Sequence, residues 1–326
     1  MTPLARGAAY GAVIVTVLLS IVALAIWFER KFAGRMQSRL GPTLVGPVGL
    51  LQPIADVLKL LQKEDIVPAD ADHALFNAAP VLAVLFSLGA AAVVPFSPAT
   101  IAADLDVGVL YVLAIGGLMV IPTFAAGWAS NNKFALLGGM RAVAQSVSYG
   151  VPLVLATLVP ILLAGTLSLS GIVQWQSHHH WFAFWPIIPG LPAFFVFFLA
   201  MLAESNRIPF DIPEAESELV AGVTTEYTGA KFTLFYMGEY LHTLVGSAVA
   251  AALFFGGWDG PFAPGLPWMV GKTLALFVMV YWVRWSLLRF RADQLMELCW
   301  KRLTPLAVGL VLLAAAWTQF VPGGAQ

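Results

Sequence analysis

The chain has few charged residues and a single cysteine. Of its 326 residues, 11% are charged and 60% are hydrophobic, whereas a soluble domain carries roughly 25% charged residues. The one cysteine, Cys299, excludes a disulfide framework or a four-thiolate metal site within the chain. The net charge of -1 argues against a nucleic-acid partner. A chain this apolar must use lipid as part of its solvent.

Signatures of redox and nucleotide chemistry are missing as well. The sequence has no phosphate-binding glycine loop and no dinucleotide fingerprint. Of the five histidines, only His242 falls inside an apolar run, so a facing pair of haem ligands is not expected. The external triplet His178, His179 and His180 is at most an opportunistic metal site. The sequence therefore predicts no redox centre in this chain, and electrons must arrive from a partner.

What is present is a series of apolar runs about 20 residues long, the length of a helix that crosses a bilayer. The runs are continuous rather than alternating, which excludes the strands of a lipid-facing barrel. They lie at about 9–28, 77–96, 107–128, 142–167, 186–203, 236–257, 268–288 and 303–321. The sequence predicts an all-α, polytopic transmembrane bundle of about eight helices, forming one integral membrane domain over residues 1–326.

The basic residues predict the orientation. All of the 17 Lys and Arg residues except Arg6 and Lys272 fall in alternate connections between the runs. Those connections are residues 29–76, 129–141, 204–235 and 284–302. Positive charge marks the cytoplasmic side, so both termini are expected outside the cytoplasm. Loops 29–76 and 204–235 are too long and polar to be simple connectors, and function is expected there.

Loop 29–76 contains a predicted amphipathic helix of about four turns. Leu50, Ile54 and Leu61 recur at helical spacing. On another face lie the polar residues Gln52, Asp56, Lys59 and Lys63. The segment is too short and too charged to span, so we expect a helix along the cytoplasmic-side membrane surface. It could pack on other cytoplasmic segments, or it could frame a lateral opening for a lipid-soluble ligand, and the two interpretations are compatible.

Residues 204–239 are strongly acidic. The segment contains seven carboxylates and only two basic residues, Arg207 and Lys231. The carboxylates are Glu204, Asp211, Glu214, Glu216, Glu218, Glu226 and Glu239. One interpretation is local, because Asp211 and Glu214, with Pro213 between them, match a capping box that starts a helix in water.

Glu204 and Glu239 fit that local interpretation less well, because each borders an apolar run. A carboxylate near the centre of a bilayer costs about 3 kcal/mol unless it meets water, a cation or a proton. Burial and neighbouring like charges raise carboxyl pKa values toward working pH. These acids therefore predict a proton-exchanging funnel at the cytoplasmic edge.

Three segments on the predicted cytoplasmic side carry a family resemblance. They are ERKFAGRMQSRLGPTLVGPVGLLQPIADVLKLLQKE, FAAGWASNNKFALLGGMRAVAQSVSYG and AESNRIPFDIPEAESELVAGVTTEYTGAKFTLFYMGEY. In this order they resemble the quinone-site membrane subunit of respiratory complex I. The resemblance implies a bacterial inner-membrane subunit of NADH:quinone oxidoreductase, an electron- and proton-transporting translocase.

The resemblance also implies partners and substrate. NADH, FMN and iron–sulfur clusters would belong to partner subunits, and a quinone such as ubiquinone would be the substrate. This chain, binding no cofactor alone, would form the membrane side of the quinone chamber and dock the peripheral arm. The implied chamber residues are Arg30, Arg35, Arg39, Asp56, Lys59, Arg207, Asp211, Glu214, Glu216, Glu218 and Glu226. Glu204 and Glu239 would begin the proton path.

One position departs from the family. The motif Ser-Tyr-Glu of the family reads Ser148, Tyr149 and Gly150 here, and no acid lies between Arg141 and Glu204. The usual proton route is therefore interrupted. Three other functions remain open: a membrane subunit of an energy-converting hydrogenase or formate hydrogenlyase, a secondary transporter, or a structural anchor. A transporter is expected to show internal repeats and helices broken at the membrane midplane, whereas here the charge gathers at the cytoplasmic edge.

Overall fold

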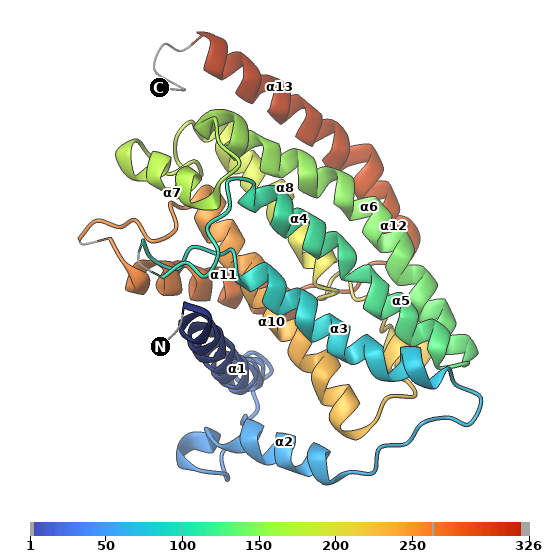
Figure 1. The fold of residues 1–326 in the computed structure, drawn as a ribbon. Coiled ribbons are helices and arrows are strands. Elements are labelled where there is room, and N and C mark those ends of the chain that lie inside the picture. The colour runs from blue at the N-terminus through green and yellow to red at the C-terminus, as the bar shows by residue number, and fades with distance from the viewer. Residues whose placement is uncertain (1–2, 99, 263, 321–326) are drawn as a thin grey trace. The chain divides into compact units, whose positions relative to one another are not determined.

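The described part of the chain is helical. The computed structural model describes residues 3–98, 100–262 and 264–320. Within these ranges the only extended pairing is an isolated bridge between Ser97 and Thr100. The helices are α1 (Pro3–Met36), α2 (Gln52–Gln62), α3 (His73–Ala91), α4 (Gly108–Leu118), α5 (Val120–Ala129), α6 (Lys133–Ala164), α7 (Leu169–His178), α8 (Ile187–Glu204), α9 (Glu216–Leu219), α10 (Gly229–Phe254), α11 (Leu266–Ser286), α12 (Ala292–Glu297) and α13 (Thr304–Phe320) (Figure 1). Short turns of 3-10 or π-helix are η1 (Pro47–Gly49), η2 (Gly222–Thr224) and η3 (Leu298–Leu303). The predicted all-α class is confirmed.

Six helical stretches among the described residues are long and apolar enough to cross a membrane. They are His73–Ala91, Gly108–Ala129, Lys133–Ala164, Ile187–Glu204, Leu266–Ser286 and Ala292–Phe320. Each corresponds to one predicted apolar run. The two remaining runs, 9–28 and 236–257, fall on α1 and α10. That these two helices also cross the membrane stays a prediction.

Several predicted boundaries were wrong. Helix α1 continues to Met36, and α6 begins at Lys133. The charged residues at these two helix ends, which had been predicted to lie in loops, are therefore helical. Helix α2 has 11 residues, about three turns instead of four. Helix α7 has no counterpart among the predicted runs, because ten residues are too few to produce a membrane-length signal.

The capping box predicted at Asp211 and Glu214 was also wrong. Residues 212–214 form turns, and α9 begins only at Glu216 after the N-cap residue Ala215. The reason is a close approach within this loop. Gly222 has a φ of 54°, and a side chain there would collide with the Pro213 carbonyl. The turn is therefore shaped by a contact with η2 that local propensity does not encode.

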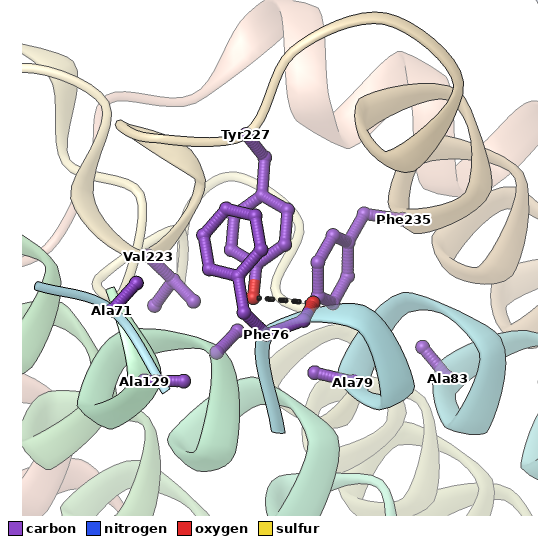
Figure 2. Packing of buried hydrophobic residues seen from close by; sticks show 9 residues of the cluster. Ala71, Phe76, Ala79, Ala83, Ala129, Val223, Tyr227 and Phe235 are labelled. Carbon is purple, nitrogen blue, oxygen red and sulfur yellow. Dashed lines mark hydrogen bonds between the residues drawn. The ribbon is translucent and has the colours of Figure 1, made fainter. Parts of the chain in front are cut away.

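The chain divides into two compact units. Unit 1 comprises Met1–Leu88, Ile121–Met140 and Pro213–His242. Its core, drawn in Figure 2, gathers Phe76, Tyr227 and Phe235 around small alanines of α3 and α5. Unit 2 comprises Gly89–Val120, Arg141–Ile212 and Thr243–Gln326. There α8 is largely buried, and α13 packs against it.

Candidate functional site

Of the charged residues predicted in loop 29–76, Arg30 and Asp56 form a network, and Arg35 and Arg39 line a cavity, both in unit 1. Arg30, near the end of α1, forms an ion pair with Asp56 of α2. Gln52, one turn earlier in α2, donates from Nε2 to the other carboxylate oxygen of Asp56 at 3.0 Å. Helix α2 packs against α1 (Figure 1). The predicted helix period thus brings Gln52 and Asp56 to one face, where they meet Arg30.

Arg35 and Arg39 lie elsewhere in the same unit. Together with Lys31 and the aromatic residues Trp27, Phe28 and Phe32 they line a cavity of about 330 Å³. The loop after α1 can fold back so closely because Gly34 and Gly41 meet backbone there. A β-carbon on Gly34 would lie 2.8 Å from the Gly41 nitrogen. The predicted set therefore divides: Arg30 and Asp56 pair with each other, whereas Arg35 and Arg39 border a separate cavity.

Glu226 bonds to the short connection between α5 and α6. Asn132 donates from Nδ2 to Glu226 Oε1 at 2.6 Å, and its own Oδ1 accepts from the Phe134 amide at 2.8 Å. The amide of Asn132 is therefore oriented by the first turn of α6, and Glu226 is half-buried. This contact joins two of the predicted cytoplasmic loops, 129–141 and 204–235, inside unit 1.

Tyr227, next to Glu226, anchors the same loop in the core of unit 1. Its ring stacks on Phe76 with centroids 4.1 Å apart, and its hydroxyl donates to the Phe76 carbonyl at 3.2 Å (Figure 2). Burial raises the pKa of Tyr227 above its ordinary value of 10.0, and a hydrogen bond with Ser130 partly opposes that rise. The hydroxyl therefore stays protonated and keeps its role as a donor.

Glu29 is a buried acid that the sequence reasoning missed. Its carboxylate accepts a hydrogen bond from the Tyr240 hydroxyl, and both residues are almost fully buried. The sequence did hold a signal, because Glu29 ends a long apolar run in the same way as Glu204. Glu239, one residue before Tyr240, is half-buried. Unit 1 thus contains a buried acid on α1 that contacts α10.

Glu204, the last residue of α8, lies in unit 2 against α4. A β-carbon on Gly116 would collide with Glu204 Oε1, so the carboxyl occupies the space that the missing side chain leaves. Tyr149 of α6 is buried and interacts electrostatically with Glu204. Gly150 follows directly, and a β-carbon built there meets nothing within 4 Å. A β-carbon would therefore not clash at the position where the resemblance implies a glutamate.

Gln145 holds the segment that follows Glu204. This buried side chain donates from Nε2 to the Ala203 carbonyl at 2.7 Å and to the Phe210 carbonyl at 2.9 Å. No sequence pattern indicated this role, because the two carbonyls lie about 60 residues away along the chain. Within this segment Arg207 is buried and donates from Nε to Thr243 Oγ1 at 3.4 Å. Gln145 and Thr243 thereby link α6 and α10 to the start of loop 204–235.

The remaining predicted residues are dispersed. Lys59 and Glu218 are exposed, and Asp211 and Glu214 are half-buried. The side chain of Glu216 lies outside the described part of the chain. Glu204, Arg207 and Asp211 belong to unit 2, and the other predicted site residues belong to unit 1. No group of three or more His, Cys, Asp and Glu that could hold a metal occurs among the described residues.

The six membrane-length apolar helices found among the described residues are those of a helical integral membrane protein. Comparison with known proteins identifies its family. The family model described as NADH dehydrogenase matches residues 9–315. The chain therefore belongs to the NADH dehydrogenase family.

Relatives agree with this assignment over nearly the whole chain. The H subunit of the NADH-quinone oxidoreductase of Anaeromyxobacter dehalogenans (strain 2CP-C) is 44% identical over an alignment 341 positions long. The alignment covers 95% of this chain and 82% of that protein. The corresponding protein of Brevibacillus brevis is 45% identical, with 95% and 92% covered. That of Dehalococcoides mccartyi (strain ATCC BAA-2266 / KCTC 15142 / 195) is 46% identical, with 94% and 84% covered. The resemblance stated from the three motifs is confirmed.

Proposed function

We propose that this chain is the membrane subunit that completes the quinone chamber of a proton-translocating NADH:quinone oxidoreductase. Its relatives are named as a subunit of that enzyme. Partner subunits would hold FMN and the iron–sulfur clusters that carry electrons from NADH, and they would dock on the cytoplasmic loops. The chain would lie in the bacterial inner membrane with both termini on the periplasmic side.

The pairing of Arg30 with Asp56 is the observation that supports the chamber most directly. The pair joins the end of a long apolar helix to an amphipathic helix whose large apolar residues are exposed, among them Ile54, Leu58 and Leu61. A quinone has an apolar tail and a polar head. An apolar surface helix beside a charged network offers both environments, with the lipid on one side and the network on the other.

The chamber can be tested by quinone kinetics of the whole complex. Arg30→Gln and Asp56→Asn should each lower kcat/KM for quinone roughly tenfold, which corresponds to about 1.4 kcal/mol of transition-state stabilisation. The double variant should lose little more, because both changes break one interaction. The matched control is Arg291→Gln with Asp293→Asn, an exposed ion pair at α12. Wild-type kinetics in the Arg30 and Asp56 variants would contradict the proposal.

In this proposal Glu204 and Glu239 transfer protons. The other acids of the loop change their protonation when negative charge develops on the quinone. Reduction of a quinone takes up two protons and creates negative charge while they arrive. A proton moved against 100 mV costs about 2.3 kcal/mol, so reduction and transfer must be coupled by an element that both sites bias. Loop 204–235 is that candidate element, because side chains of α6 and α10, among them Gln145 and Thr243, bond to its first residues.

Glu204→Gln tests the proton path. In the reconstituted complex we expect the ratio of protons moved to NADH oxidised to fall, while NADH oxidation by an artificial soluble acceptor is unchanged. Glu297→Gln, in an exposed ion pair with Lys301, is the control. An unchanged rate and ratio would remove Glu204 from the path.

Gly150→Glu tests whether the missing family acid matters here. A β-carbon at Gly150 meets nothing within 4 Å, so the substitution causes no clash at the backbone. If the present route is incomplete, the proton ratio should rise. An unchanged ratio would mean that water or a neighbouring subunit already bridges the position.

A further inference from the structure

The cavity beside the end of α1 has two chemical halves. One half is apolar and is built by Trp27, Phe28 and Phe32 of the helix with Leu40 and Val48 of the following loop. The other half is basic and consists of Lys31, Arg35 and Arg39. Lys31 and Arg35 stand one helical turn apart, and the next loop brings Arg39 to the same cavity. All of these residues belong to unit 1.

The three cations lack a counter-charge in the described chain. Neither Lys31 nor Arg35 forms an ion pair within the described residues. Arg39 donates from Nε to the neutral Gln37 side chain at 2.7 Å. Arg30 on the same helix differs, because Asp56 neutralises it. The cavity therefore concentrates positive charge that an anion from outside the described chain can balance.

The apolar side of the cavity is open. Leu40 is 87% exposed and Val48 is 65% exposed, so the described chain leaves the apolar side chains at this edge uncovered. Trp27 donates its indole N–H to the Val48 carbonyl at 3.3 Å, which fixes the ring between helix and loop. A tryptophan with an apolar body and a bonded polar edge is typical of the membrane–water interface.

We propose that this cavity binds an anionic phospholipid, with the phosphate at Lys31, Arg35 and Arg39 and the first acyl carbons against Trp27, Phe28 and Leu40. A basic pocket beside transmembrane helices on the cytoplasmic side fits an anionic headgroup. A volume of about 330 Å³ suits a headgroup and its glycerol but not a whole lipid, so the chains continue into the bilayer. A neutral quinone head offers these three cations no charge to balance. This lipid site requires that α1 crosses the membrane. It does not require that the chain takes part in quinone reduction.

Retention of lipid by the intact complex tests the proposal. The complex is purified in detergent, placed in nanodiscs of phosphatidylcholine with a minor share of phosphatidylglycerol, and its retained lipids are counted by native mass spectrometry. The variant Lys31→Gln, Arg35→Gln and Arg39→Gln should lower the preference for phosphatidylglycerol about a hundredfold, since each of the three basic side chains contributes about fivefold near an anionic surface. The variant Lys31→Arg, Arg35→Lys and Arg39→Lys should retain it.

Matched controls separate this site from general surface charge. Arg291→Gln, Lys301→Gln and Arg302→Gln remove three exposed cations near α12 and η3 and should leave the preference unchanged. Soluble glycerophosphate should not displace the lipid, because it lacks the acyl carbons. Equal loss in both triple variants, or full displacement by glycerophosphate, would overturn the lipid site. So would wild-type lipid retention in the Lys31, Arg35 and Arg39 variant. The quinone proposal is judged separately from Arg30 and Asp56.

Discussion

The two units stabilise their irregular segments in different ways. Unit 1 joins distant segments through charges and rings: Arg30 with Asp56, Lys231 with Asp65, and Tyr227 with Phe76. Unit 2 relies on side chains that bond backbone carbonyls. Gln145 contacts the segment after α8, Gln176 donates to the Ala252 carbonyl at 2.9 Å, and Lys272 donates to the Phe255 and Gly257 carbonyls.

The difference follows from the burial of the groups that are paired. A buried helix end has no water to satisfy its carbonyls, so a buried amide or ammonium must do so. Charged side chains that are partly exposed, such as Arg30 and Asp65, can pair at small net cost. We therefore expect the loss of a neutral amide in unit 2 to cost more stability than the loss of an ion pair in unit 1.

Gln145→Leu should show the largest effect. It removes one donor from each of two buried carbonyls, which keep the backbone N–H groups of Asn206 and Ile212 as donors. A lost hydrogen bond costs about 1 kcal/mol, so we expect the complex to lose about 2 kcal/mol of stability, measured as a lower temperature of thermal unfolding. Gln174→Leu, an exposed glutamine on α7, is the control. If both variants unfold at the same temperature, the hydrogen bonds from Gln145 to backbone carbonyls do not contribute to the stability of unit 2.

Tyr227→Phe should have an intermediate effect. It keeps the stacked ring on Phe76 and removes the hydroxyl with its hydrogen bonds to the Phe76 carbonyl and Ser130, so we expect a loss of about 1 kcal/mol. The raised pKa also predicts a pH dependence. Above about pH 10 the unfolded state loses the tyrosine proton while the folded state keeps it, so stability falls with rising pH. That alkaline fall should be smaller in Tyr227→Phe, as measured by thermal unfolding between about pH 8 and about pH 11.

The control for Tyr227→Phe is Tyr111→Phe, since the hydroxyl of Tyr111 has no hydrogen bond among the described residues. An equal pH dependence in wild type and Tyr227→Phe would show that the ring alone, without its hydroxyl, holds this part of unit 1.

Lys231→Met should have the smallest effect. Lys231 pairs with Asp65 at 2.9 Å, but Asp65 is half exposed, and pairs of this kind contribute less than about 1 kcal/mol. The ammonium also lies 5.1 Å from the centre of the Phe76 ring, a contact that methionine partly replaces. The loss should shrink further at high salt. Lys301→Met, in an exposed helical pair, sets the baseline. If Lys231→Met lowered the stability more than Gln145→Leu does, the ion pair in unit 1 would matter more than the buried amide in unit 2, contrary to our expectation.

The candidate site could be predicted only in part. The motifs indicated which loops matter, and the helical period of the predicted helix put Gln52 and Asp56 on one face. The pairing of Asp56 with Arg30 of α1 was not predicted. The separation of Arg35 and Arg39 from that pair could not be foreseen, because it depends on the loop folding back onto Gly34. Glu29 was missed although it ends an apolar run, because nothing near it in the sequence indicates its partner Tyr240, which follows 211 residues later.

The order of residues is enough to specify the helical class and the membrane-length helices, because an apolar run near 20 residues has one stable arrangement in lipid. It is also enough to specify the family, since three motifs in order are specific. The partners of individual side chains depend on the folded chain instead: Tyr240 for Glu29, Asn132 for Glu226 and the loop carbonyls for Gln145. Such contacts join segments that are far apart along the chain, and their geometry depends on how the helices pack rather than on any local periodicity.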